Sequence, residues 1–357
     1  MSLNHEEEPP TPAAPRALPH PRSVPTTLAV IVVILVAAAA IGATAAYYTL
    51  RPVPHPSGPG TVTVYDDLGR SVTAPVNAAH IVVLAPSVMD IVYRLGLRSH
   101  VVAVGCTVSF PGGILNEYSP NQTALWSLTN SSCITDFPGV NTEAVANATP
   151  GLVLATTLTS QGDVSTLTNT YHVPVVILTP STLAGVIDDV RIVAELFPSA
   201  QSTASALESE LSRTITQLSS EAANLTAAGV ASPSVLLTYY FDSGGYYTYG
   251  PGSFGDSMLS LVGGTNVADA VLLQYGEMNA TAVLNDQPNV VLYGTSWNDA
   301  YLVAGETPSV WSSAPYWSQL TGSHVAVDVT LVSEPDPSMV LALPWIQHAL
   351  YPSHVPP

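Results

Sequence analysis

SAQSTASALESELSRTITQLSSEAA, residues 199–223, is the stretch around which the rest of the chain is arranged. Its apolar residues recur at steps of three and four, which places them on one face of a helix. They are Leu207, Leu211, Ile215, Leu218 and Ala222. Ser199 follows Pro198 and is the expected N-cap. A helix of this length spans about 37 Å, the width of a small domain.

The sequences on the two sides of this helix resemble each other. Residues 141–157 read NTEAVANATPGLVLATT, and residues 279–295 read NATAVLNDQPNVVLYGT. Each predicts a short helix, a turn at Pro150 or Pro288, and a buried strand. Because strands alternate with helices, we predict α/β architecture with two Rossmann-like lobes joined by one long helix. The alternative is coincidence, since helix–proline–strand units are common in α/β proteins.

The N-terminal part of the chain has three compositions. Residues 1–26 are polar and proline-rich, which predicts a disordered cytoplasmic tail. Residues 27–50 contain a charge-free apolar run long enough to cross a bilayer. We expect this transmembrane helix to anchor a single-pass cell-membrane protein whose main domain is extracytoplasmic. A signal peptide cleaved near Ala43-Thr44-Ala45 is the alternative. The remaining predicted segments are a stiff tether at 51–60, an N-terminal lobe at 61–197, a connecting helix at 198–230 and a C-terminal lobe at 231–352.

Charge is sparse and acidic. The 357 residues carry 26 Asp and Glu against eight arginines, with no lysine and a net charge of −18. A basic face for nucleic acid is therefore excluded. A low charge density with a pI near 4.5 suits an acidic medium, where carboxylates are partly neutralised.

Two features suit an extracytoplasmic domain. Cys106 and Cys133 fall in the same lobe, where a disulfide is expected and two free buried thiols are the alternative. Asn-x-Ser/Thr sequons, which predict glycosylation, follow the anchor at Asn121, Asn130, Asn147, Asn224 and Asn279.

No catalytic or metal-binding pattern emerges. Residues 251–255, PGSFG, lack the first glycine of a nucleophile elbow, and a chain without lysine has no P-loop. The histidines have no paired ligand spacing, so we expect neither enzyme activity nor a metal or cofactor. Residues 240–253, YFDSGGYYTYGPGS, are predicted to form an exit loop whose tyrosines line a pocket; packing in the core is the alternative.

Five segments in order carry a family resemblance. They are HIVVLAPSVMDIVYRLGLRSHVVAVG, GVNTEAVANATPGLVLA, VPVVILTP, YTYGPGSFGDSMLSLVGGTNVAD and the second repeat. Residues 61–352 thereby resemble the helical-backbone class of ABC-transporter substrate-binding proteins, the cobalamin, siderophore and haem receptors of the bacterial periplasm or archaeal surface. The resemblance implies a monomer that captures a metal chelate between two lobes. It also implies delivery to an ABC permease with its ATPase, without nucleic acid.

The resemblance also implies which positions act. Ligand-facing positions at strand ends of the first lobe are Ser87, Thr107, Phe110, Phe137 and Thr156. Those of the second lobe are Tyr246, Tyr247, Tyr249, Tyr275 and Trp297. Thr156 stands where cobalamin-binding members have an aromatic residue.

Permease docking in this family uses one glutamate per lobe. Glu143 matches the first, but the second falls at Thr281, so Glu277 is the nearest candidate. A solvated glutamate in the first helical turn is the alternative for Glu143. Cobalamin or another corrinoid is the favoured ligand, with a ferric siderophore or haem next. Two other functions stay open, a surface structural or glycan-binding protein on this fold and a metal-ion receptor.

Overall fold

The computed structural model describes residues 56–58, 60–105, 133–135, 139–270, 275–295, 308–328 and 334–356. The chain divides into two units, Met1–Val53 and Pro54–Pro357. Every element described below belongs to the second unit. Among the described residues, no helix has the length and apolar character needed to cross a membrane. The predicted tail and anchor lie outside the described residues.

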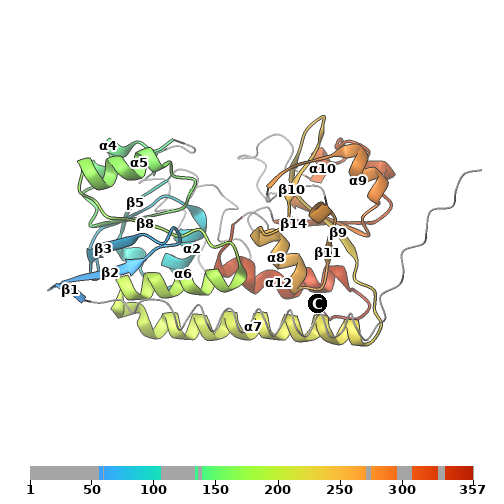
Figure 1. Ribbon diagram of the computed structural model, residues 1–357, viewed down its shortest axis with the longest axis horizontal. Coiled ribbons are helices and arrows are strands. Elements are labelled where there is room, and N and C mark those ends of the chain that lie inside the picture. The colour runs from blue at the N-terminus through green and yellow to red at the C-terminus, as the bar shows by residue number, and fades with distance from the viewer. Residues whose placement is uncertain are drawn as a thin grey trace, which may run out of the picture. The chain divides into compact units, whose positions relative to one another are not determined.

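A parallel sheet forms the first half of this unit (Figure 1). Its strand order is β6-β5-β4-β7-β8, and a small antiparallel sheet, β1-β2-β3, precedes it. The strands are β1 Pro56–Gly58, β2 Thr61–Tyr65, β3 Ser71–Pro75, β4 Ile81–Val83, β5 Val101–Gly105, β6 Cys133–Thr135, β7 Leu152–Ala155 and β8 Val175–Ile177. The helices are α2 Pro86–Arg94, η1 Arg98–His100, α4 Thr142–Asn147, α5 Gln161–Ser165, η3 Thr166–Thr170 and α6 Leu183–Leu196.

The sequence Asp66-Asp67-Leu68-Gly69, between two short strand-like runs, predicts a β-hairpin, and the antiparallel pairing of β2 with β3 confirms it. The turn of this hairpin covers the outer edge of the parallel sheet. The Asp67 backbone N–H donates to Ile177 O at 3.1 Å. The Ile177 N–H donates to Asp66 Oδ2 at 3.3 Å, and the Thr179 N–H to Asp67 Oδ2 at 2.5 Å. The edge strand β8 therefore has fewer free backbone groups with which another chain could pair.

Helix α7, Gln201–Ala227, is the predicted long helix, and the short turn η4, Pro198–Ala200, leads into it. Ser199 is wrong as the N-cap, because Ala200 holds that position and the Ser199 hydroxyl donates to Asn77 Oδ1 at 2.9 Å. The helix ends four residues later than predicted, and Gly229 beyond it has a left-handed φ of 76°.

The second half has a sheet of order β12-β10-β9-β13-β14, with β11 also paired to β9. Strands β9, β11, β13 and β14 are parallel, but β10 is antiparallel to both β9 and β12. The strands are β9 Ser234–Phe241, β10 Gly245–Tyr249, β11 Thr265–Asn266, β12 Tyr275–Asn279, β13 Val290–Thr295 and β14 Ser323–Asp328. The helices are α8 Phe254–Leu261, η5 Val267–Ala270, α9 Ala280–Asp286, α10 Pro308–Trp311, η7 Trp317–Gln319 and α12 Pro337–Leu350.

The prediction that residues 240–253 form a loop is wrong, because most of them build the β9–β10 hairpin. Asp242 closes the turn, since its Oδ1 accepts from the Gly244 N–H at 2.7 Å. A Cβ on Gly245 would lie 2.1 Å from Met278 O, so only glycine fits beside β12.

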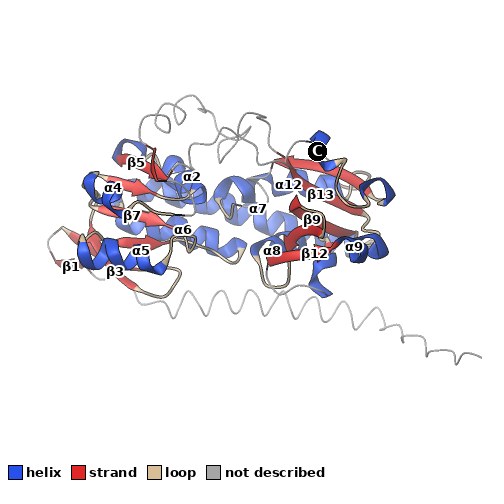
Figure 2. Cartoon of the chain, turned by 90° about the horizontal axis from the view of Figure 1, so that it is seen from above, coloured by secondary structure: helices blue, strands red, loops and turns tan. Residues whose placement is uncertain are grey.

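A layer of helices, rather than α7 alone, connects the two sheets (Figure 2). One apolar core runs without interruption from Val83 of β4 through Leu196 of α6, Leu211 of α7 and Leu343 of α12 to Leu237 of β9. Separate apolar clusters cover the other face of each sheet. The α/β class and the long helix are confirmed, whereas the lobe boundaries at 61–197, 198–230 and 231–352 stay a prediction.

The two repeated units share their capping geometry. Asn141 caps α4 by accepting from the Ala144 N–H, and Asn279 caps α9 by accepting from the Thr281 N–H, each at 2.9 Å. In both units the residue before the proline is left-handed, with φ of 49° at Thr149 and 43° at Gln287. The repeat is therefore structural as well as sequential.

Asn141→Ala and Asn279→Ala should each lower the free energy of unfolding by about 1 kcal/mol, because each leaves a helical N–H without its cap. The two capped helices pack into different apolar clusters, so the losses should add and the double variant should lose about 2 kcal/mol. Urea unfolding of unglycosylated protein measures both losses. Asn224→Ala, at an exposed position on α7, is the control and should change little. A loss at only one of the two caps would contradict equivalence of the units.

Candidate ligand-binding site

Ser87 lies where the first sheet meets the second half of the unit. It follows β4, occupies the first turn of α2 and is buried. Its backbone N–H donates to Glu334 Oε2 at 3.3 Å, and its hydroxyl also hydrogen-bonds that carboxyl. Glu334 lies just before α12, so this contact joins positions 247 residues apart.

Tyrosine rings gather on the β9–β10–β12 side of this contact. The Tyr249 ring centroid lies 5.1 Å from that of Tyr239 and 5.6 Å from that of Tyr275. Glu334 helps to raise the pKa of Tyr249, although burial is the larger cause. Tyr275 is 54% exposed and Tyr249 only 3%. Ser87, Glu334 and the exposed Tyr275, with the buried Tyr249 packed behind the Tyr275 ring, form the group that we call the Glu334 site.

The other hairpin tyrosines face different surroundings. Tyr246 is fully buried among Trp311 and other apolar residues, and its hydroxyl donates to Pro315 O at 2.5 Å. Burial raises the pKa of Tyr246 further above its ordinary value, so this hydroxyl stays a neutral donor near neutral pH. Tyr247 is half-buried, its ring centroid lies 5.4 Å from that of Tyr240, and its hydroxyl donates to Asp242 Oδ2 at 3.2 Å. For Tyr246 and Tyr249 the burial favours the core alternative.

Thr156 lies at the end of β7 and is buried. Its hydroxyl oxygen accepts from the Leu158 N–H at 3.4 Å, a local contact that closes the turn after the strand. Among the described residues, no hydrogen bond links Thr156 to the Glu334 site.

A buried group of carboxyls adjoins the Glu334 site. Asp90 of α2 accepts from Arg94 Nε at 2.9 Å and from the Ser338 N–H of α12 at 3.0 Å. Asp336 caps α12 by accepting from the Met339 N–H at 2.8 Å. No group of His, Cys, Asp and Glu in the described residues is arranged to hold a metal ion.

Burial is the main cause of the unusual protonation of this group. It raises the pKa of Glu334 to about 7 and that of Asp336 well above its ordinary value, with Asp90 adding to the second effect. Burial also raises the pKa of Asp90, against the opposing charge of Arg94. Sequence reasoning missed Glu334; its only local signal was the sequence Glu-Pro-Asp-Pro before a helix.

The predicted docking glutamates are both exposed. Glu143 lies in the first turn of α4, two residues after the cap. Glu277 lies in β12 opposite Tyr247, two residues before the equivalent cap. The two glutamates are therefore not at matching positions of the repeat, and their docking role stays a prediction.

Several predictions lie outside the described residues. These are the ligand-facing roles of Thr107, Phe110, Phe137 and Trp297 and the disulfide between Cys106 and Cys133, of which only the backbone of Cys133 is described.

Comparison with known proteins identifies the family. The periplasmic binding protein family model matches residues 81–320, about two thirds of the chain. The chain therefore belongs to this family of solute-binding proteins of the ABC-importer type. No curated protein sequence matches it.

Three solved structures illustrate the shared fold. Their sequences are 18–20% identical to this chain, so the likeness shows the fold alone. The periplasmic haem-binding protein RhuT from Roseiflexus sp. RS-1 is 20% identical, with a TM-score of 0.61 over 77% of this chain and 98% of that one. An ABC-type Fe3+-hydroxamate transport protein from Saccharomonospora viridis is 18% identical, with a TM-score of 0.62 over 81% and 98%. The vitamin B12-binding protein BtuF of Vibrio cholerae is 18% identical, with a TM-score of 0.58 over 77% and 98%.

Proposed function

We propose that the chain is the extracytoplasmic solute-binding component of an ABC importer that captures a metal chelate at the Glu334 site. A corrinoid is the favoured ligand, with a ferric hydroxamate siderophore or haem next. The chain delivers this ligand to a permease, to which Glu143 and Glu277 dock, and the N-terminal helix holds it at the membrane. It works as a monomer and catalyses nothing.

The positions of the arginines favour a neutral ligand over a strongly anionic one. All five arginines beyond the tether lie in the described residues, and the chain has no lysine. Arg70, Arg94 and Arg191 are paired with carboxylates. Arg98 lies in η1, which leads into the start of β5, and Arg213 lies on α7. Strongly anionic ligands need arginine clamps, whereas a neutral corrinoid needs hydroxyl, amide and aromatic partners.

Titration of the full-length protein with cyanocobalamin, monitored by tryptophan fluorescence and by corrinoid absorbance, tests this proposal. Saturable binding at a stoichiometry of one is expected. Ferrichrome and haemin are the comparison ligands, and binding of either one alone would replace the corrinoid as the ligand. Binding of none of the three would overturn the proposal.

Tyr275→Ala should weaken cyanocobalamin binding about tenfold, because an exposed ring beside Tyr249 offers a flat apolar surface for the ligand. Tyr316→Ala is the matched control, since Tyr316 is 41% exposed but takes no part in the Glu334 site. Equal affinities of the two variants would place the ligand elsewhere.

A further inference from the structure

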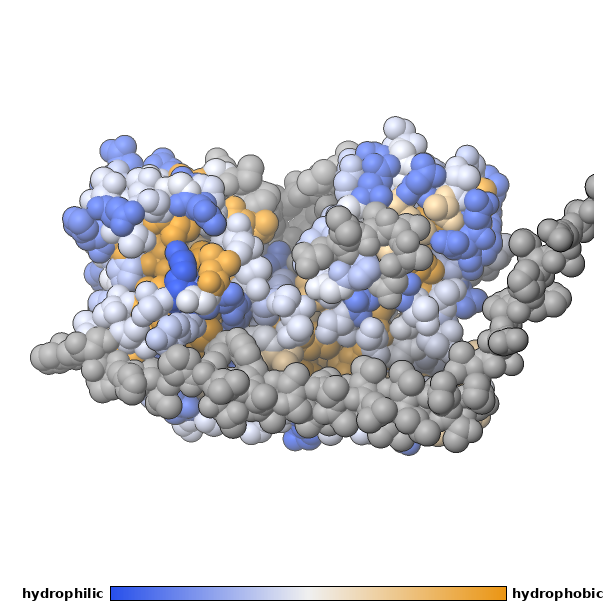
Figure 3. Space-filling view, in the orientation of Figure 1, coloured by the Kyte–Doolittle hydropathy of each residue, from blue (hydrophilic) through white to orange (hydrophobic). Residues whose placement is uncertain are grey.

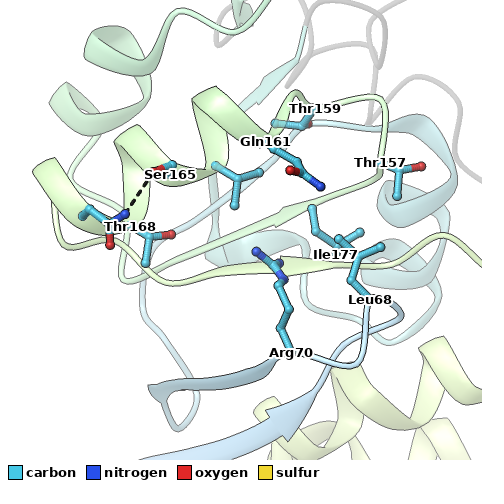
Figure 4. A pocket seen from close by; sticks show the side chains of 10 residues that line it. Leu68, Arg70, Thr157, Thr159, Gln161, Ser165, Thr168 and Ile177 are labelled. Atoms are coloured by element: carbon cyan, nitrogen blue, oxygen red, sulfur yellow. Dashed lines mark hydrogen bonds between the residues drawn. The ribbon is translucent and has the colours of Figure 1, made fainter.

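A cavity of about 450 Å³ lies on the flank of the first sheet, apart from the Glu334 site (Figure 4). Its volume falls within the range of roughly 300–1,000 Å³ that is usual for small-molecule sites. The walls come from the β2–β3 turn, the loop after β7, and the consecutive helices α5 and η3. Its lining residues are Leu68, Arg70, Thr157, Thr159, Gln161, Val164, Ser165, Thr168, Asn169 and Ile177.

The floor of the cavity is aliphatic. Ile177 of β8 and Val164 of α5 belong to the apolar core on this face of the sheet. Leu68 extends the apolar surface outward and is 48% exposed. Figure 3 shows a patch of apolar side chains at the surface over β8, surrounded by polar residues. An aliphatic body would bury its surface here.

Arg70 is held in place by a buried partner. Its Nε and Nη2 both donate to Asp66 Oδ2, with Nε at 2.9 Å, and Nη2 also reaches Val175 O at 3.2 Å. The Asp66 side chain is fully buried and also accepts from backbone N–H groups. Among the described residues Nη1 has no hydrogen-bond partner, so its two N–H groups stay available at a fixed position.

Two further side chains offer uncommitted hydrogen-bonding groups. Gln161 and Thr168 are exposed on the helical wall and make no side-chain hydrogen bond within the described part of the chain. Figure 4 shows Arg70 and Gln161 extending into the cavity from opposite walls. Helix η3, which carries Thr168, is a π-helical turn, a distortion frequent at functional sites.

The charge of the lining selects the ligand class. The chain has 26 acidic residues, yet none of those that the structure describes lines the cavity. An amine would meet a guanidinium and find no carboxylate. A phosphate dianion would find a single arginine whose charge Asp66 already offsets. A monocarboxylate carries one charge, and it requires only the guanidinium that Arg70 shares with Asp66, together with neutral N–H and O–H donors.

We propose that this cavity is a second binding site, for a small aliphatic monocarboxylate. The carboxylate accepts from Arg70 Nη1 and from the Gln161 amide, and the aliphatic chain covers Leu68, Val164 and Ile177. The site lies outside the set of residues expected to face the metal chelate; only Thr157, next to Thr156, approaches that set.

Calorimetric titration of the full-length protein at pH 7 with hexanoate, hexanamide and hexylamine tests this proposal. Hexanoate should bind saturably, hexanamide about tenfold more weakly, and hexylamine not measurably. Saturable binding of hexylamine, equal affinity for hexanoate and hexanamide, or no saturable hexanoate binding would each overturn the proposal.

Two variants locate the site. Gln161→Leu keeps the size of the side chain but removes its donor, so it should weaken hexanoate binding about tenfold. Ser165→Trp places a ring across an exposed wall and should abolish binding. Thr203→Trp, on the exposed face of α7, is the matched control and should bind as the wild type does. Unchanged affinity in Ser165→Trp would overturn the assignment. These results do not depend on whether the chain binds a corrinoid.

Discussion

Arg94→Met should lower the free energy of unfolding at pH 7 by about 3 kcal/mol, because removal of one member of a buried ion pair leaves a buried charge without compensation. The Asp90 carboxylate is fully buried, and the Arg94 side chain is 18% exposed. Asp336 and Glu334 adjoin the same group, so Arg94 is the cation among three carboxyls. Urea unfolding followed by tryptophan fluorescence measures the loss.

The same substitution should also loosen the contact between the two halves of the unit. Arg94 Nη2 donates to Ser338 Oγ at 2.7 Å, and Ser338 Oγ lies 2.9 Å from Asp90 Oδ1. Hydrogen exchange in the first turn of α12 should therefore accelerate. At pH 4 the loss of stability should shrink, because the carboxyls are then more protonated and need less compensation.

Arg191→Met is the matched control. Arg191 of α6 also pairs with two carboxylates, Asp188 at 3.1 Å and Glu208 at 2.7 Å, but its side chain is 35% exposed. Water screens this pair, so its loss should cost no more than about 1 kcal/mol. Equal losses for the two arginine variants would show that burial does not set the strength of the Arg94 pair.

Local sequence signals predicted the elements that depend on neighbouring residues. Asn141 and Asn279 cap the repeated helices because each side chain reaches an N–H two or three residues ahead. The Asp66–Gly69 turn and the strand Leu152–Ala155 follow from turn chemistry and an apolar run. The end of α7 was misplaced because Gly229, the usual signal for a helix end, was not used.

The features that sequence reasoning missed depend on distant contacts. Residues 240–253 read as a loop because of their glycines, but β12 pairs with Gly245–Tyr249 and makes them a strand. Glu334 gains its place from Ser87, 247 residues earlier in the chain. The contact between Ser87 and Glu334 cannot be predicted from a single sequence, since a glutamate before a proline is ordinarily a solvated loop residue. The sequence singled out the tyrosines of this segment, but which face of the sheet each side chain lies on depends on strand pairing.

The wild-type protein should be most stable below about pH 4.5 and lose stability as the pH rises towards 7. Burial raises the Glu334 pKa from 4.5 to about 7, so the folded state holds a proton that the unfolded chain releases. Stabilisation by this group is therefore complete below the unfolded pKa and lost above the folded one. A shift of this size corresponds to about 3 kcal/mol as an upper limit.

Glu334→Gln should remove much of this pH dependence, because the amide resembles the protonated carboxyl and still accepts from the Ser87 N–H. At pH 7.5 the variant should be about 2 kcal/mol more stable than the wild type, and at pH 4 the two should be equal. A smaller decline should persist, since burial also raises the pKa values of Asp336 and Asp90, while the raised pKa of Tyr249 keeps this phenol neutral across the range.

Urea unfolding between pH 4 and 8 measures both curves, with Glu143→Gln as the control for an exposed glutamate. Wild-type stability that rises between pH 4.5 and 7 would contradict the buried-acid argument and the expectation that this chain suits an acidic medium. A decline that Glu334→Gln leaves unchanged would instead assign the proton to Asp336 or Asp90. If Glu334 holds the proton, the ligand site gains a negative charge as the pH rises through about 7, so cyanocobalamin affinity should be measured over the same range.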